Sequence, residues 1–382
     1  MNQRSAPTLR ERISEEIRRR GPIPFSRYME MCLYDSDLGY YSRNAEQFGK
    51  AGDFFTSSDI HAVFGRLLAR QFEEMWRALG SPAEIEILEL GPGRGLFARD
   101  VLDWAEKKFP AFFHAVRYSL LESSPALQAH LRSTLSRHFA SGKASLVGNP
   151  KPSSPDTPAL FFANEFFDAL PVEILSAQGE LRISEKDAHL FETWAPASAE
   201  ALEFVDRYGV HPEPLERVEA PLVSQRYMAE IAASLRAGFL VVIDYGYTRQ
   251  EQLAGRHRDT LLAYRRHSSS RDPYQAPGEQ DITAHVNFTA LAAAAERQGV
   301  RVHPLLTQSQ FLLGIGEVTQ FSDAFEECRL PQERAKVALQ LKHLVTPAGL
   351  GETFHVLVGS KGVPPEVVSG LSGLNFARAG RP

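Results

Sequence analysis

The chain has 382 residues, 43% of them hydrophobic and 23% charged, which is enough apolar material for a large core and argues against disorder. Its 42 basic and 47 acidic residues give a formal net charge of −5, so no basic excess indicates a nucleic-acid partner. Two cysteines and scattered histidines indicate neither a disulfide scaffold nor a metal site, and no apolar run reaches the length of about 18 residues that a membrane span needs.

The first 80 residues predict an N-terminal helical extension. Residues 8–20 form an amphipathic pattern whose apolar stripe is Leu9, Ile13 and Ile17, and a second long helix is expected from about residue 60 to 79. Between them, Asp53 and Thr56 belong either to a lid over a ligand or to the cap of the second helix. The N-terminus mixes glutamates with arginines, unlike a signal or transit peptide, so a cytoplasmic location is expected.

From residue 81 to 362 we expect one α/β domain. Apolar strand patterns at 85–90, 116–121, 144–147, 159–163 and 239–244 are separated by helical patterns at 95–108, 125–139 and 222–236. This alternation predicts a mostly parallel sheet with helices on both faces. A helix at 288–298 and strands at 300–306 and 353–358 follow. Insertions are expected at about 171–220, with period-2 antiparallel strands, and at 309–345, and residues 363–382 are expected to be a flexible tail.

The most informative stretch joins the first of these strands to its helix through Glu89, Gly91, Pro92, Gly93 and Gly95. Glycines at alternate positions accept positive φ angles and bring backbone amides close to a ligand. A dinucleotide fingerprint has the spacing G-x-G-x-x-G, whereas here Leu96 stands where its third glycine is expected. The alternatives are a dinucleotide loop, a purely structural turn, or a loop for another nucleoside.

The third alternative is favoured by the acids around the loop. Glu89 before the glycines suits a ligand with an amino group, and Glu122 at the end of the next strand can accept hydrogen bonds from two ribose hydroxyls. An amino group and a ribose without a pyrophosphate are parts of S-adenosylmethionine. The pattern resembles the E/D-x-G-x-G-x-G motif of class I methyltransferases.

Two further strand ends carry polar residues. Asn164, Glu165 and Asp168 follow the strand at 159–163, where ligands bind in open α/β sheets, and the two acids are expected to meet across a helical turn. The alternative is that Asn164 caps a turn and the acids are solvated. Asp244 ends another strand and either caps the next segment or joins the site. His285 lies near two polar residues and is either a structural histidine or a proton relay.

Several motifs in order along the chain resemble the MidA-type methyltransferases, a family that includes the mitochondrial arginine methyltransferase assisting respiratory complex I assembly. They are Gly49-x-x-Gly52-Asp53-Phe54-x-Thr56-Ser57, the glycine loop, Leu121-Glu122-Ser123-Ser124-Pro125, Asn164-Glu165-Phe166-Phe167-Asp168-Ala169-Leu170-Pro171, Asp244-Tyr245-Gly246 and residues 281–288. The resemblance implies a Rossmann-like class I methyltransferase fold. It also implies that Ser123, Asn164, Asp53 and Thr56 contribute to the cofactor site. Phe55, Ser58 and Asn287 depart from the family pattern and put substrate choice in doubt.

We therefore expect an S-adenosylmethionine-dependent methyltransferase that modifies arginine in a protein substrate, and the resemblance implies a complex I subunit as that substrate. Glu165, Asp168 and His285 are the expected catalytic residues. Alternatives are a non-catalytic assembly factor that binds the same cofactor and an NAD-dependent oxidoreductase. No metal, nucleic acid or membrane span is expected, and the sequence does not fix the oligomeric state.

Overall fold

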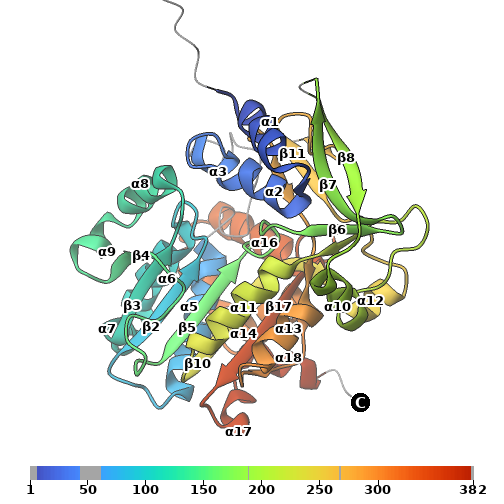
Figure 1. Cartoon of the computed structure of the whole chain (residues 1–382). Coiled ribbons are helices and arrows are strands. Elements are labelled where there is room, and N and C mark those ends of the chain that lie inside the picture. The colour runs from blue at the N-terminus through green and yellow to red at the C-terminus, as the bar shows by residue number, and fades with distance from the viewer. Residues whose placement is uncertain (1–6, 44–61, 188, 266–267, 380–382) are drawn as a thin grey trace, which may run out of the picture. The chain divides into compact units, whose positions relative to one another are not determined.

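The structure, a computed structural model, describes residues 7–43, 62–187, 189–265 and 268–379 (Figure 1). Contacts divide the chain into two compact units. Unit 1 comprises Met1–Phe54, Phe167–Tyr227 and Gly246–Leu291, and unit 2 comprises Phe55–Phe166, Met228–Tyr245 and Ala292–Pro382. This division differs from the expected boundaries near residues 80 and 362, because segments far apart in sequence contribute to each unit.

Unit 2 is built on a mostly parallel sheet. Its strands are β2 (Ile85–Leu90), β3 (Val116–Leu121), β4 (Ala144–Val147), β5 (Ala159–Asn164), β10 (Gly238–Tyr247), β15 (Arg301–Val302), β16 (Leu306–Thr307) and β17 (Phe354–Lys361). The order is β4-β3-β2-β5-β10-β17-β15, with β16 also pairing with β17. The first five are parallel, whereas β17 runs antiparallel to β10, and β15 and β16 run antiparallel to β17.

Burial explains why these segments become central strands. All six residues of β2 and the first five of β5 are buried, as expected for parallel strands covered on both faces. The helices are α5 (Ala62–Ala78), α6 (Leu96–Lys108), α7 (Pro110–Ala115), α8 (Pro125–Thr134), α9 (Ser136–Ala140), α11 (Leu222–Ser234), α13 (Phe288–Glu296), α14 (Gln308–Glu317), α15 (Ser322–Phe325), α16 (Pro331–Val345), α17 (Pro365–Val368) and α18 (Ser372–Ala379). The predicted class of fold is confirmed.

Aromatic packing fixes the helix that follows the glycine loop. Phe97 in the first turn of α6 stacks on Phe162 of β5, with 4.3 Å between ring centroids, and Phe72 of α5 packs edge-on against Phe162. Such pairs add about 0.5–1.5 kcal/mol to the burial of their area. They hold the start of α6 against the strand that carries Asn164.

Unit 1 combines short helices with antiparallel strands. Its helices are α1 (Leu9–Arg20), α2 (Phe25–Tyr34), α3 (Tyr40–Arg43), α10 (Ala199–Arg207) and α12 (Arg249–Leu253). Its strands are β1 (Ile23–Pro24), β6 (Glu173–Ser176), β7 (Gly179–Lys186), β8 (His189–Ala195), β9 (Val218–Ala220), β11 (Leu262–Arg265), β12 (Ser268–Ser270), β13 (Asp281–Thr283) and β14 (Val286–Asn287). One sheet has the order β1-β7-β6-β9 with β8 beside β7, and another has the order β12-β11-β13.

The expected helix at the N-terminus is present as α1. Its predicted stripe of Leu9, Ile13 and Ile17 is buried. Thr8 and Glu11 form a capping box at its start, which satisfies two backbone donors reciprocally.

Two expectations need correction. The helix expected at 125–139 is broken at Leu135 into α8 and α9. The tail after Val363, expected to be flexible, contains α17 and α18. The Gly373 amide donates to Oε1 of Gln71 at 2.8 Å, and the Ser372 amide donates to Oε2 of Glu74 at 2.8 Å. This segment is held by residues that lie 298 or more positions earlier in the chain. Its own composition does not reveal these partners.

Candidate functional site

The predicted polar residues of unit 2 gather at the carboxyl edge of its sheet. In the strand register Leu90 lies opposite Leu121 and Ala163, and Asn164 lies opposite Ile243. The residues that follow these positions therefore leave the sheet at one edge. They are Gly91 after β2, Glu122 after β3 and Glu165 after β5, and Asp244 lies on β10 at the same level. This is the edge at which open α/β sheets bind ligands.

The glycine loop needs glycine for its backbone. Gly91, Gly93 and Gly95 have φ angles of +64°, +52° and +75°, a region that other residues occupy at a cost of about 1–2 kcal/mol. The Gly91 amide donates to the Leu121 carbonyl at 3.0 Å, and the Gly95 amide donates to the Pro92 carbonyl at 2.9 Å. The loop is thus tied to the neighbouring strand and turns directly into α6.

The three glycines differ in what surrounds them. A Cβ atom added to Gly91 would lie 2.9 Å from Cδ2 of Phe166, and one on Gly95 would lie 2.6 Å from Cδ2 of Leu131. A Cβ on Gly93 would meet no atom within 4 Å among the described residues. Gly91 and Gly95 therefore permit packing within the protein, whereas Gly93 borders open space among the described residues.

Glu89 is a buried acid on β2. Its carboxylate accepts a hydrogen bond from the Tyr118 hydroxyl at 2.8 Å, and burial raises its pKa to about 8, with a smaller upward contribution from the charge of Glu122. Tyr118 was not predicted. The sequence could have indicated it, because Tyr118 lies between Val116 and Leu120 on the buried face of the predicted strand.

Glu122 follows β3 and faces the loop. Its Oε1 accepts from the Ser124 amide at 2.8 Å. Burial raises its pKa to about 7, while hydrogen bonds from the backbone of Ser124, Ser123 and Gly93 act in the opposite direction. Ser123, predicted as a cofactor residue, thus contacts Glu122 through its backbone.

Asn164 is the last residue of β5, and the chain bends at Glu165. The Asn164 side chain donates through its Nδ2 to Oε1 of Glu165 at 3.2 Å. Its own Oδ1 is buried and has no hydrogen-bond partner among the described residues, and a buried acceptor left in this way is costly. Glu165 has a φ angle of +50°, which is unusual for a residue other than glycine.

The expected helical turn between Glu165 and Asp168 does not form. The left-handed conformation of Glu165 stops a helix from starting, and residues 165–170 form bends and a turn. Glu165 belongs to unit 2 and Asp168 to unit 1. The prediction that both acids line one helical turn is therefore wrong.

In unit 1, Asp168, Asp281 and His285 are brought close through the backbone. The Ala284 amide donates to the Asp168 carbonyl at 2.9 Å. The Tyr41 hydroxyl donates to Oδ1 of Asp281 at 2.9 Å. Asp168 and Asp281 are 5% and 6% exposed, so unit 1 holds two buried carboxylates beside the segment that carries His285.

His285 pairs with a second histidine, which the sequence did not reveal. Its Nδ1 lies 3.1 Å from Nδ1 of His257, whose ring stacks on Tyr247. Burial, and to a smaller degree the charge of His257, lowers the pKa of His285 to about 4, so this imidazole is neutral near pH 7. Asp53 and Thr56 lie outside the described residues.

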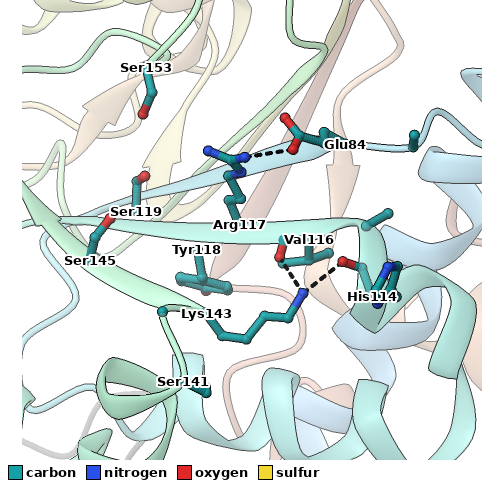
Figure 2. Close-up of a pocket in the computed structure, with 13 residues that line it drawn as sticks. Glu84, His114, Val116, Arg117, Tyr118, Ser119, Ser141, Lys143, Ser145 and Ser153 are labelled. Carbon is teal, nitrogen blue, oxygen red and sulfur yellow. Dashed lines mark hydrogen bonds and ion pairs between the residues drawn. The ribbon is translucent and has the colours of Figure 1, made fainter.

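A pocket of about 510 Å³ lies at the opposite, amino edge of the same sheet (Figure 2). Its cations already serve the fold. Arg117 pairs with Glu84 at 2.5 Å, and Nζ of Lys143 donates to the carbonyls of His114 at 2.7 Å and Val116 at 3.1 Å, at the end of α7. None of the predicted site residues lines this pocket, so it is separate from the glycine loop.

Comparison with known proteins identifies the family. A family model described as an S-adenosyl-L-methionine-dependent methyltransferase matches residues 67–306, more than half of the chain. The chain belongs to this methyltransferase family. S-adenosylmethionine is its cofactor and methyl transfer its activity, which confirms the expected class of enzyme and decides against the dinucleotide alternative.

Individual relatives extend over nearly the whole chain. The Drosophila melanogaster protein arginine methyltransferase NDUFAF7 homolog, mitochondrial, is 30% identical, and the match covers 93% of this chain and 85% of that protein. The human protein arginine methyltransferase NDUFAF7, mitochondrial, is 28% identical, with 91% and 82% covered. A COG1565 superfamily member from Burkholderia thailandensis, solved with S-adenosyl-homocysteine, has a TM-score of 0.81 at 28% identity, with 97% and 94% covered.

The expected cytoplasmic location is contradicted. The relatives from Drosophila melanogaster, Danio rerio and Homo sapiens are mitochondrial proteins by name. The mixed charge of the N-terminal segment, on which the expectation rested, therefore does not report the compartment of these methyltransferases.

The described ranges of the chain also bear on membrane spans and metal ligands. None of the helices seen there combines the length and apolar character needed to cross a bilayer. Within the same ranges, no three His, Cys, Asp or Glu side chains are grouped as metal ligands would be.

Proposed function

We propose that this methyltransferase transfers the methyl group to an arginine side chain of a protein, with a subunit of a respiratory complex I-type assembly as the substrate to test first. The proposal is supported by relatives named protein arginine methyltransferase that match 90% or more of this chain at 28–30% identity. The complex I subunit follows from the resemblance to MidA-type proteins.

The cofactor is proposed to bind at the carboxyl edge of the unit 2 sheet. The observation that carries this placement is the buried Oδ1 of Asn164, which has no donor among the described residues and lies at the edge of the sheet where Gly93 borders open space. A ligand at this edge would supply the missing donor. In this proposal Glu122 accepts hydrogen bonds from the ribose hydroxyls. Glu89, whose pKa of about 8 leaves it largely protonated near pH 7 in the ligand-free protein, releases its proton when it faces the cationic amino group. The other expected contacts, Gly91, Pro92, Gly95 and Ser123, shape the loop around them.

When bound, S-adenosylmethionine supplies a methyl group attached to a positively charged sulfur. The chain has to place the arginine nitrogen in line with that bond, and such positioning contributes several kcal/mol, up to about 7–11 kcal/mol in favourable cases. We assign this task to Glu165, since it stands at the same edge as the loop and its carboxylate can bind a guanidinium with charge-assisted hydrogen bonds.

The proton is handled late in the reaction. A guanidinium, with a pKa above about 12, is not deprotonated beforehand by a carboxylate. Methyl transfer to the nitrogen would leave the electron pair of the broken methyl–sulfur bond on sulfur and would release one guanidinium proton, which Glu165 or solvent would accept. Asp168 and the neutral imidazole of His285 remain proposed participants from unit 1.

Mass spectrometry tests this function directly. The protein is incubated with methyl-labelled S-adenosylmethionine and individually purified soluble complex I subunits, and tryptic peptides are sequenced for labelled methylarginine. We expect label on arginine of at least one subunit and none with the Gly93→Val variant. Label on another residue type would contradict arginine as the acceptor. Cofactor binding without any label would favour the alternative of a non-catalytic assembly factor.

A further inference from the structure

Asp244 of β10 is completely buried at the carboxyl edge of the unit 2 sheet. Its Oδ2 accepts from the Phe166 amide at 3.2 Å, and its Oδ1 accepts from its own neighbour, the Tyr245 amide, at 2.9 Å. One carboxylate thus joins the backbone of β10 to the segment that follows β5. The amide of Glu165, the residue before Phe166, donates to the Ile243 carbonyl of β10 at 3.0 Å.

The residue that Asp244 holds lies against the glycine loop. Phe166 is half-buried, and its Cδ2 is so close to Gly91 that an added Cβ there would lie only 2.9 Å away. The ring therefore packs on the backbone of the first loop glycine. A continuous set of contacts runs from the Asp244 carboxylate through the Phe166 amide and ring to Gly91.

We propose that Asp244 is a positioning residue for methyl transfer. It acts through Phe166 to fix the position of the glycine loop relative to the sheet and the orientation of the Asn164 and Glu165 side chains. The inference rests on the proposed placement of the cofactor at this loop. Asp244 itself touches neither cofactor nor substrate in this account. Its effect on them is indirect.

Two features of the turn make such support necessary. Glu165 is held in a left-handed conformation, which persists only where its surroundings enforce it. Gly91 lacks a side chain that could anchor the loop, so the Phe166 ring supplies the packing surface. Small displacements of such supporting groups change ligand binding and turnover even when the residues that contact the ligand are unchanged.

A double-mutant cycle tests the proposal with S-adenosyl-homocysteine affinity, measured by calorimetry, as the readout. Asp244→Asn keeps the size of the side chain. It replaces one of the two carboxylate oxygens, each of which accepts from a backbone N–H, by an NH₂ group that can only donate. We expect this variant to weaken S-adenosyl-homocysteine binding about tenfold, because the loop and Asn164 then shift from the positions that bind the ligand. Phe166→Ala should have a similar effect. Because both act on one contact path, the double variant should be no weaker than the worse single variant.

Glu86→Gln is the matched control. Glu86 is also a buried acid of this sheet and accepts from the Ser153 amide at 2.6 Å, but it lies near the amino end of β2. Its replacement should lower the melting temperature and leave S-adenosyl-homocysteine affinity unchanged within twofold. Thermal melts of all variants separate loss of folding from loss of binding.

Additive effects of Asp244→Asn and Phe166→Ala would overturn the proposal, as would a folded Phe166→Ala protein with unchanged affinity, even if Asp244→Asn fails to fold. The proposed function can fail independently. If the wild-type protein binds S-adenosyl-homocysteine but labels no arginine, the substrate assignment is wrong while the cycle still decides the role of Asp244.

Discussion

Replacing Gly93 by valine should abolish cofactor binding in a protein that still folds. The structure separates the two effects. Valine at a φ angle of +52° strains the backbone by about 1–2 kcal/mol or somewhat more for a β-branched residue, against a typical total stability of about 5–15 kcal/mol. Among the described residues, chain neighbours apart, no atom lies within 4 Å of the new Cβ, so no clash of this Cβ adds to the cost.

The cofactor would meet the new methyl groups instead. We expect S-adenosyl-homocysteine affinity to fall at least a hundredfold in calorimetric titration. Gly142→Val is the matched control, since Gly142 has a φ angle of +72°, also has nothing within 4 Å of an added Cβ, and lies at the opposite edge of the sheet. It should lower stability by a similar amount and leave affinity unchanged.

Gly95→Ala completes the comparison. Its Cβ would lie 2.6 Å from Cδ2 of Leu131 and 3.2 Å from Cδ1 of Leu135, so overpacking of about 1–3 kcal/mol adds to the backbone strain. We expect a larger loss of stability than in Gly93→Val and a smaller loss of affinity. A folded Gly93→Val protein that binds S-adenosyl-homocysteine within twofold of the wild type would refute the assignment of the loop.

Three further predictions concern the acids. Glu122→Ala should weaken S-adenosylmethionine binding tenfold or more, because two bonds to a charged acceptor worth about 1.5–3 kcal/mol each are lost; a calorimetric loss below twofold would exclude the ribose role. Burial holds the pKa of Glu89 at about 8 and that of Glu122 at about 7, so the ligand-free fold binds more protons than the unfolded chain between pH 4.5 and 8. The free energy of unfolding should therefore fall as the pH rises through this window, while cofactor affinity increases. In Glu89→Gln the fall should be less steep in urea titrations. An equally steep fall in this variant would contradict the assignment. Glu165→Gln or Asp168→Asn should slow methyl transfer roughly a hundredfold with S-adenosyl-homocysteine affinity within a few-fold, and normal rates in both variants would show that neither acid acts in the reaction.

The strands of the central sheet could be predicted from the sequence because each is marked by a local run of apolar residues. The segments at 85–90, 116–121 and 144–147 have the predicted bounds, since apolar runs in parallel strands stop where glycine or polar residues begin. Glu89, Glu122 and Asn164 were proposed as site residues for the same reason: each lies at or near the end of such a run.

What escaped prediction depends on partners distant in sequence. The left-handed turn at Glu165 is held by Ile243 and Asp244, 78 residues away in the case of the Phe166–Asp244 bond, so local spacing favoured a helix there. His257 is 28 residues from His285 and meets it through a loop in which His257 itself has a φ angle of +54°. Neither contact leaves a periodic signal in the sequence.

A crystal structure with S-adenosyl-homocysteine would show the cofactor site itself. We expect the ligand at the carboxyl edge of the unit 2 sheet, with its ribose hydroxyls within hydrogen-bond distance of the Glu122 carboxylate, its body beside Gly93, and one donor on Oδ1 of Asn164. Ligand bound at the amino edge, near Lys143, or at the carboxyl edge without contact to Glu122 and Asn164, would contradict this placement of the cofactor.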